Sequence, residues 1–263
     1  MSADADIKIE IRDLTMAYGS FVVMKDINAK IKRGEVFVIM GGSGCGKSTL
    51  LRHMIGLKQP AKGDIFYDGA PFWQSSEEQR QERLRRFGVL FQSGALWSSM
   101  TLTENITLAL GEYTDLSAAD MLDIARLKLA LVGLKGFEDY YPAEISGGMC
   151  TRAGLARAMA LDPEILFFDE PSAGLDPISS RNLDELILQL RDTLGATFVV
   201  VTHELASIFT IADNSVFLDP NTRTMRANGS PREMLKHSTD PAVQEFLTRG
   251  EKSASDTAAA KPV

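Results

Sequence analysis

The sequence predicts an α/β fold in which a largely parallel sheet carries helices on both faces. Predicted strands at 36–40, 164–168 and 196–201 alternate with amphipathic segments, and this repetition of strand and helix favours parallel strands. Residues 7–31 instead alternate apolar and polar positions, which predicts an antiparallel β-layer before the first buried strand. Strand signals are absent between residues 93 and 161, so we expect an α-helical subdomain inserted into the α/β core.

These patterns indicate one domain over residues 1–250. Its parts would be an α/β core at 1–92 and 162–230, the helical subdomain at 93–161, and short C-terminal helices at 231–248. The segment 249–263 is rich in Ala, Ser and Lys and has no apolar periodicity, so it is predicted to be a disordered tail.

The composition is that of an ordinary globular protein, with 44% hydrophobic and 24% charged residues. A net charge of −7 argues against nucleic acid as a partner. The longest apolar runs hold about five residues, against the ~20 that a membrane-spanning helix needs. The acidic first six residues predict no secretion signal, and the two cysteines, Cys45 and Cys150, favour an intracellular compartment.

A glycine-rich segment joins the apolar run 36–40 to an apolar helical pattern that starts at Leu50. Strand, glycine loop and helix are the context in which the spacing of Gly41, Gly46 and Lys47 indicates a phosphate site rather than a turn with a chance lysine. Its backbone N–H groups would form an anion-binding nest. Lys47 would reach the β- and γ-phosphates of a nucleoside triphosphate, and the Ser48 hydroxyl would ligate Mg²⁺. The candidate binding residues are Gly41, Gly42, Ser43, Gly44, Cys45, Gly46, Lys47, Ser48 and Thr49.

Two carboxylates, Asp169 and Glu170, directly follow the apolar residues 165–168. Because parallel strands end at one edge of their sheet, these carboxylates are expected beside the phosphate loop. Asp169 would hold the Mg²⁺ shell, and Glu170 would polarise an attacking water as general base. The alternative is a strand that ends in a solvated acidic turn.

Two further features leave alternatives open. Ser146, Gly147 and Gly148 begin a predicted helix whose N–H groups could take a phosphate oxygen, but a plain N-cap explains them as well. Cys45 lies inside the phosphate loop, where N–H dipoles could lower the pKa of its thiol. Alkylation of Cys45 would then inhibit turnover and nucleotide would protect; otherwise Cys45 is only a small residue.

The motifs together resemble the ATP-binding subunit of an ABC transporter. The resemblance implies a P-loop ABC ATPase fold with a RecA-like core, ATP and Mg²⁺ as cofactors, and ATP hydrolysis coupled to transport. The matching residues occur in order along the chain: Tyr18, the loop from Gly41 to Thr49, Gln92, Ser146 to Met149, 165–170, 172–176 and His203.

The resemblance also implies roles for single residues. Tyr18 would stack on adenine, Gln92 would sense the γ-phosphate and Mg²⁺, and His203 would contact the γ-phosphate. Two copies would form a head-to-tail homodimer with two ATPs sandwiched between them, and Asp176 would lie in the interface. The residues that close over the ATP of the second copy would be Ser146, Gly147, Gly148 and Met149. The family usually has Gln where this chain has Met149, which removes one amide contact but keeps the serine hydroxyl and the glycine amides.

Four segments narrow the resemblance further, namely 91–97, 146–149, 174–178 and 240–247. They are similar to the maintenance-of-lipid-asymmetry (Mla) branch, whose ATPases power phospholipid transport by MCE proteins across the Gram-negative envelope. This implies a peripheral location at the cytoplasmic face of the inner membrane. The implied partners are an integral-membrane permease of the MlaE type, an MCE-domain lipid-binding protein and, as a further candidate, a STAS-domain subunit. Ser172 and Thr151 depart from that branch, which usually has Phe and a basic residue there.

Other functions share parts of this pattern. The ATPase subunit of another ABC importer, for amino acids or ions, would have the same architecture. A non-transport ABC ATPase usually has two ATPase units or a long coiled-coil insertion, and neither is seen in the sequence. A small-molecule kinase or GTPase would leave Ser146 and His203 without a task, and a plain binding protein would not need Glu170. Trp97 and its apolar neighbours could dock a permease helix or pack under a loop.

Overall fold

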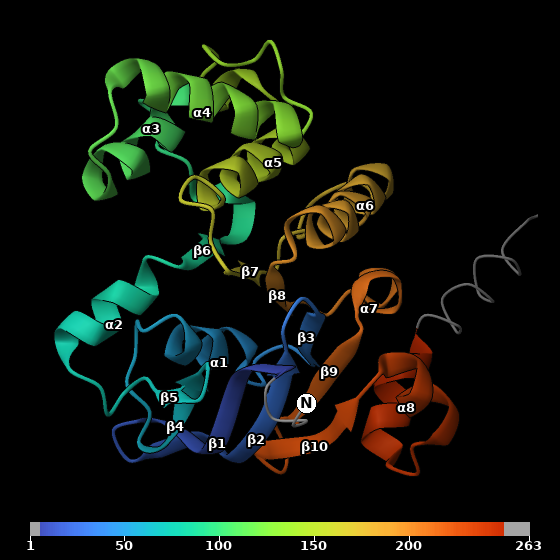
Figure 1. The fold of residues 1–263 in the computed structure, drawn as a ribbon. Coiled ribbons are helices and arrows are strands. Elements are labelled where there is room, and N and C mark those ends of the chain that lie inside the picture. The colour runs from blue at the N-terminus through green and yellow to red at the C-terminus, as the bar shows by residue number, and fades with distance from the viewer. Residues whose placement is uncertain (1–5, 250–263) are drawn as a thin grey trace, which may run out of the picture.

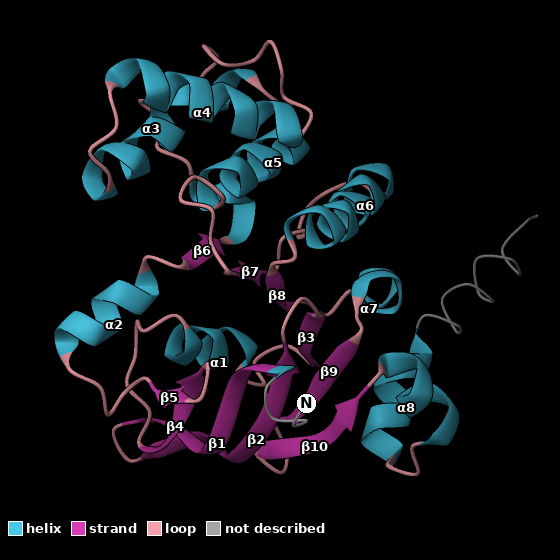
Figure 2. Cartoon of the chain, in the orientation of Figure 1, coloured by secondary structure: helices cyan, strands magenta, loops and turns pink. Residues whose placement is uncertain are grey.

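The computed structural model describes residues 6–249, which form two sheets with helices around them (Figure 1). The smaller sheet is antiparallel and has the strand order β2-β1-β4-β5. The larger sheet has the order β10-β9-β3-β8-β7-β6. Helices α3, α4 and α5 gather in one lobe, while the other helices lie around the sheets (Figure 2). The predicted α/β class with an antiparallel β-layer and a separate helical region is confirmed.

The antiparallel sheet follows from period-two alternation in its long strands. In β1 and β2 most apolar side chains face a buried layer, while polar neighbours such as Arg12 and Lys30 are exposed. The turn after β4 has positive φ at both Asp68 and Gly69, as an Asp-Gly hairpin requires. The strands of this sheet are β1 (Ile7–Tyr18), β2 (Phe21–Lys32), β4 (Lys62–Tyr67) and β5 (Ala70–Pro71).

The larger sheet is parallel except at one edge, where β10 runs antiparallel to β9. The sequence did not predict β10, because only Met225 and Ala227 give it an apolar alternation. Its strands are β3 (Val36–Gly41), β6 (Phe87–Leu90), β7 (Ile165–Asp169), β8 (Thr197–Val201), β9 (Asn214–Asp219) and β10 (Thr224–Gly229).

The central strands are buried on both faces and supply two separate cores. In β3, Val38 and Met40 point into the core that the lobe helices share, whereas Phe37 and Ile39 point into the core between the sheets and α1. β8 divides in the same way. This is why these strands read as continuous apolar runs rather than alternating ones.

The lobe helices are α3 (Leu102–Tyr113), α4 (Ala118–Leu131) and α5 (Gly147–Ala158). Each begins at a residue whose side chain caps a backbone N–H of the first turn, namely Thr101, Ser117 and Ser146. The 3₁₀ segment η2 (Gln92–Ala95) connects the lobe to the end of β6. Because the lobe's apolar residues belong to the same core as one face of β3, lobe and sheet share a continuous hydrophobic contact.

The remaining helices cover the sheets. Asp176 caps α6 with Pro177 in its first turn, and Gly195 ends it in the left-handed conformation. These helices are α1 (Lys47–Met54), α2 (Glu77–Leu84), α6 (Pro177–Leu194), α7 (Leu205–Ile211) and α8 (Pro231–His237), followed by helical residues at 241–249, whereas the 3₁₀ segment η3 (Pro142–Glu144) precedes α5 in the lobe. The tail predicted to be disordered falls outside the described residues except for Arg249. Within residues 6–249, no helix combines the length and apolar character that crossing a bilayer demands.

The contact between α6 and α7 contains a buried carboxyl group. Asp184 of α6 is only 5% exposed. Burial raises the pKa of Asp184 to about 6, and the carboxylates of Glu204 and Glu185 act in the same direction against the Ser207 hydroxyl. Because the ordinary pKa is 3.8, the folded chain keeps this proton to higher pH than the unfolded chain. The contribution of Asp184 to the free energy of unfolding therefore falls as the pH rises from about 4 through 6.

Asp184→Asn removes this titration, so we expect its stability relative to the unmodified chain to be more favourable at pH 8 than at pH 5. Urea midpoints at the two pH values measure the difference. Asp123→Asn serves as the control, because Asp123 is 78% exposed. Equal effects of Asp184→Asn at both pH values would contradict the assignment.

Candidate functional site

Two positions of the loop between β3 and α1 require glycine, because each combines a positive φ with a close neighbouring atom. Gly41 has a φ of +151°, and a Cβ there would lie 2.5 Å from the Leu218 carbonyl oxygen. Gly46, with a φ of +93°, precedes the first turn of α1, and a Cβ there would come within 3.0 Å of a Val23 methyl group. Cβ atoms at Gly42 and Gly44 would meet no neighbour within 4 Å. Close packing at Gly41 and Gly46 therefore fixes the loop backbone, whereas the backbone at Gly42 and Gly44 is accessible. This combination is what an anion-binding nest requires.

The Lys47 side chain packs against the backbone of this loop. Its Nζ donates to the carbonyl oxygens of Gly41 and Gly42, each at 3.1 Å, and lies 3.7 Å from Glu170 Oε1. Only 7% of the side chain is exposed. The ammonium group thus holds the loop curled and faces the carboxylate that follows β7.

The ends of β7 and β8 deliver the next groups. Ser48 Oγ donates to Asp169 Oδ1 at 2.8 Å, which joins the start of α1 to the end of β7. Glu170 has a φ of +50°, and its N–H donates to the Val201 carbonyl at 2.9 Å. This left-handed conformation is costly for a residue with a Cβ, and such residues concentrate at functional sites. It turns the Glu170 side chain out of the strand direction.

His203, two residues beyond β8, completes the cluster. Its Nδ1 lies 2.8 Å from Glu170 Oε2, and 59% of the imidazole side chain is exposed. Glu170 therefore contacts Lys47 through one oxygen and His203 through the other. The structure brings together five predicted site residues from three chain segments: Lys47, Ser48, Asp169, Glu170 and His203.

The donor set beside the loop suits a magnesium ion that arrives with a phosphate. The Ser48 hydroxyl and the Asp169 carboxylate are adjacent hard oxygen donors. Residues 6–249 contain no group of three or more His, Cys, Asp and Glu side chains that could hold a metal ion by themselves. Mg²⁺ commonly binds one or two protein oxygens together with phosphate oxygens, so the residues present fit that ion.

Tyr18 lies at the rim of the loop with 49% of its side chain exposed. A hydrogen bond with Thr49 lowers the pKa of its hydroxyl, and the positive charge of Lys58 acts in the same direction. Lys58 Nζ stands 2.8 Å from the ring centroid, so an ammonium group covers one ring face. No sequence pattern in the turn after α1 indicates that Lys58 reaches Tyr18, so this contact is visible only in the structure.

Gln92 is exposed and begins η2, directly after β6 and Phe91. The following residues Ser93, Gly94 and Ala95 have φ values of 58°, 78° and 47°. Three consecutive left-handed residues form a tight local turn that aims the chain back onto α5. Within residues 6–249, no hydrogen bond or ion pair joins Gln92 to the Lys47 cluster.

The remaining predicted residues lie at the facing ends of α5 and α6. Ser146 Oγ accepts a hydrogen bond from the Met149 N–H at 3.3 Å, so it caps α5. Ser146 and Gly148 line a cavity of about 80 Å³ together with Ser179 of α6. The Asp176 carboxylate accepts the Ser179 hydroxyl at 2.6 Å, and this bond holds the pKa of Asp176 below its ordinary value. These residues therefore form a second group, separate from the loop cluster.

The position of Cys45 contradicts the prediction that its thiol is activated. Its thiol is 1% exposed and belongs to the apolar core between the sheets and α1. Burial raises the pKa of Cys45, and this outweighs the opposing effect of Lys47. The hypothesis of a thiol activated by loop dipoles is therefore wrong, because the side chain points into the core while the backbone faces the loop.

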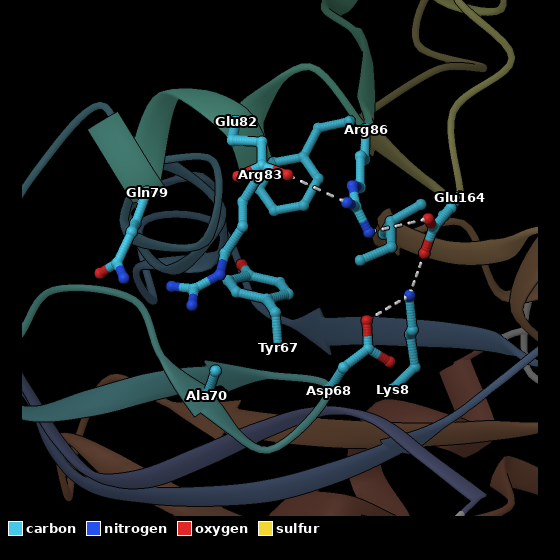
Figure 3. Close-up of a pocket in the computed structure, with 11 residues that line it drawn as sticks. Lys8, Tyr67, Asp68, Ala70, Gln79, Glu82, Arg83, Arg86 and Glu164 are labelled. Carbon is cyan, nitrogen blue, oxygen red and sulfur yellow. Dashed lines mark hydrogen bonds and ion pairs between the residues drawn. The ribbon is translucent and has the colours of Figure 1, made fainter. Parts of the chain in front are cut away.

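A second cavity, of about 290 Å³, lies at the opposite end of the parallel strands, where β6 and β7 begin (Figure 3). Its acidic groups are held in ion pairs, while Arg83 donates to the Pro71 carbonyl and the Ser75 hydroxyl. Lys8 contacts Asp68 and Glu164, and Arg86 contacts Glu82 and Glu164. This charge network braces α2 against the antiparallel sheet and is distinct from the loop cluster.

The family model for ABC transporter matches residues 24–173 of this sequence. The chain belongs to the ABC transporter family. It carries the ATPase domain of that family, and this domain binds ATP. The loop, the two carboxylates and the Ser146 segment described above all lie within the matched residues.

Several relatives of this ABC transporter domain are known. The probable ribonucleotide transport ATP-binding protein mkl of Mycobacterium tuberculosis is 43% identical over 241 residues, which cover 92% of this chain and 66% of mkl. The chain thus spans slightly less than two thirds of that relative. The intermembrane phospholipid transport system ATP-binding protein MlaF of Escherichia coli is 38% identical over 239 residues, covering 91% of this chain and 88% of MlaF.

A solved ABC cassette has the same fold. The dimeric post-hydrolysis structure of the cassette MJ0796, bound to ADP and Pi, superposes with a TM-score of 0.76 at 27% identity. The match covers 84% of this chain and 98% of that one.

The burial of Cys45 predicts that thiol reagents label its side chain slowly in this ABC domain. In the folded chain we expect iodoacetamide to modify Cys45 at least about tenfold more slowly than in the urea-unfolded chain, because the thiolate is both inaccessible and disfavoured. Mass spectrometry of the peptide containing Cys45 measures the rate. The Cys150→Ser variant isolates the signal, and equal rates in both states would contradict the burial.

Proposed function

We propose that this chain is the ATP-hydrolysing subunit of a transporter that moves phospholipids between the inner and outer membranes. The observation that carries the hydrolytic part is Glu170, whose two carboxylate oxygens contact Lys47 and His203 beside the glycine loop. The phospholipid part rests on the 38% identity to MlaF, which extends over most of both chains, and on the sequence of residues 91–97.

The protein groups divide the work as follows. The open backbone at Gly42 and Gly44 receives the phosphates, and Lys47 offers its charge from below. Ser48 and Asp169 would hold Mg²⁺, which would neutralise phosphate charge there. Glu170 accepts the proton of the attacking water as general base. His203, held through Nδ1, presents the other edge of its ring toward the γ-phosphate. Gln92 completes the set as γ-phosphate and Mg²⁺ sensor, and Tyr18 stacks on adenine.

Within one chain, Ser146, Gly147, Gly148, Met149 and Asp176 are separate from the loop cluster, and a second copy gives them a ligand. In a head-to-tail homodimer they close over the ATP bound by the partner copy. Two observations support this arrangement. Ile178, beside Asp176, is 73% exposed although apolar, and the solved MJ0796 structure with ADP and Pi is dimeric.

The wider assembly follows from the same proposal. An integral-membrane permease carries the lipid, an MCE-domain protein receives or delivers it, and a STAS-domain subunit is a further candidate partner. The chain works as a peripheral protein at the cytoplasmic face of the inner membrane. Its core would comprise residues 1–92 and 162–230, and the helical subdomain 93–161 would transmit movement to the permease.

Ribonucleotide transport is a second candidate, favoured by the higher identity of 43% to mkl. Isolation of the chain with its membrane partners, followed by mass spectrometry of the bound lipids and proteins, separates the two. MCE proteins and phospholipid support the first function. A permease complex that takes up radiolabelled nucleotides and contains no MCE protein supports the second.

Glu170→Gln keeps the shape of the side chain and removes the general base. We expect ATP to bind as before while turnover falls ~10²-fold or more, and dimers to accumulate with ATP. Lys47→Ala should weaken nucleotide binding itself, because it removes the charge beneath the loop. Phosphate release and nucleotide titration measure the two effects. Glu233→Gln, at an exposed position of α8, is the control, and wild-type turnover by Glu170→Gln would reject the base assignment.

Trp97 is the proposed contact for the permease. Asn105 fixes its backbone, accepting from the Trp97 N–H at 2.7 Å and donating to the Trp97 carbonyl at 3.1 Å, while 59% of the side chain is exposed. We expect Trp97→Ala to lower transport and permease affinity at least about tenfold, since buried aromatic anchors dominate interfaces. Co-purification with the permease measures this. Leu194→Ala, at the exposed end of α6, should change neither, and normal assembly of Trp97→Ala would exclude the contact.

A further inference from the structure

The loop after Gln92 is held against α5 at close range. A Cβ at Gly154 of α5 would lie 2.7 Å from the Gly94 Cα, and a Cβ at Gly94 would lie 2.5 Å from the Cys150 carbonyl oxygen. Glycine on both sides therefore lets two backbones touch. The loop cannot tilt toward α5, and any movement of α5 in that direction pushes the loop.

A forked side chain prevents separation in the opposite direction. Arg157 of α5 donates through Nη1 to the Ala95 carbonyl at 2.7 Å and through Nη2 to the Gly94 carbonyl at 3.1 Å. Burial of the guanidinium lowers the pKa of Arg157, and no acidic partner contributes to the shift. The partly buried guanidinium of Arg157 therefore contacts the two loop carbonyls rather than a carboxylate.

The clamped residues are in an unfavourable conformation. Ser93 and Ala95 both carry a Cβ and both have positive φ, on either side of Gly94. Residues in this region persist only where surrounding contacts over-determine them. Arg157 supplies such contacts at Gly94 and Ala95, because its planar fork matches two successive carbonyls in a way that a point-charged lysine does not.

We propose that Arg157 is a positioning residue, which ties the Gln92 loop to the helix that begins at Ser146, so that Gln92 and Ser146 move as one body. The proposal rests on the proposed ATPase function. α5 is a single helix of 12 residues from Gly147 to Ala158, so its two ends shift together. A ligand contacted at the Ser146 end therefore sets the place of Gln92 through Arg157, without Arg157 touching the ligand.

The test is a double-mutant cycle with Gln92 in the full chain. We expect Arg157→Met to lower kcat about tenfold or more, to raise the Mg²⁺ concentration for half-maximal activity, and to leave KM for ATP within about twofold. Arg157→Met combined with Gln92→Ala should be no slower than Gln92→Ala alone, because both remove the same contribution. Arg157→Lys should recover part of kcat. Additive effects, or a kcat unchanged by Arg157→Met, would overturn the proposal.

Arg232→Met is the matched control, because it also removes an arginine-to-carbonyl bond, that to Phe209 at 2.8 Å. It should leave kcat and the Mg²⁺ dependence as they are. A lower melting temperature with unchanged kcat per folded molecule would show that Arg157 only supports the fold, and would also overturn the proposal.

Hydrogen exchange tests the proposal without an activity measurement, and it does not require that Arg157→Met folds. In the unmodified chain, the amides of residues 93–95 and of α5 should exchange at rates within about tenfold, as one opening unit. Arg157→Lys should accelerate residues 93–95 selectively. If residues 93–95 exchange independently of α5 in the unmodified chain, Arg157 does not hold the loop and the helix together, and the proposal is overturned. Absence of ATP turnover in the unmodified chain would instead reject the proposed function, and the exchange result would still decide on Arg157.

Discussion

The register of β3, β8 and β7 determines where every group of the loop cluster lies. Ile39 pairs with Val201, and Val201 pairs in turn with Asp169. Parallel pairing brings the three strand ends to the same edge, so the loop after β3, the carboxylates after β7 and His203 after β8 emerge side by side. A slip of one residue in either pairing would reverse the faces of a whole strand and separate Ser48 from Asp169.

Two-sided burial is what makes that register unique. In β7, Leu166 and Phe168 fill one core while Ile165 and Phe167 fill the other. Exchanging them would place large side chains against differently shaped surfaces on both sides of the sheet, where protein interiors tolerate little change in volume. The polar cluster can remain at the edge because the strands leading to it are buried and almost entirely apolar.

The helical lobe connects the group formed by Ser146 and Asp176 to the loop cluster around Lys47. Its helices share an apolar core with one face of the sheet, yet Ser146 and Asp176 form their own group with Ser179. The link from that group toward the sheet runs through α5, Arg157 and the Gln92 loop. Packing of the paired glycines, Gly94 and Gly154, brings these elements close enough for a guanidinium to bridge them.

Much of the chain's identity can be derived from sequence alone. Apolar runs, glycine spacing and capping residues act over a few neighbours, so the α/β class, the loop and the carboxylates after β7 are predictable. Tertiary structure decided which side of the loop each group faces. Cys45 turns into a core, Lys58 covers Tyr18, Arg157 reaches Gly94, and β10 completes an edge. These outcomes depend on partners distant in sequence, and no local pattern specifies the side chain that a folded neighbour will present.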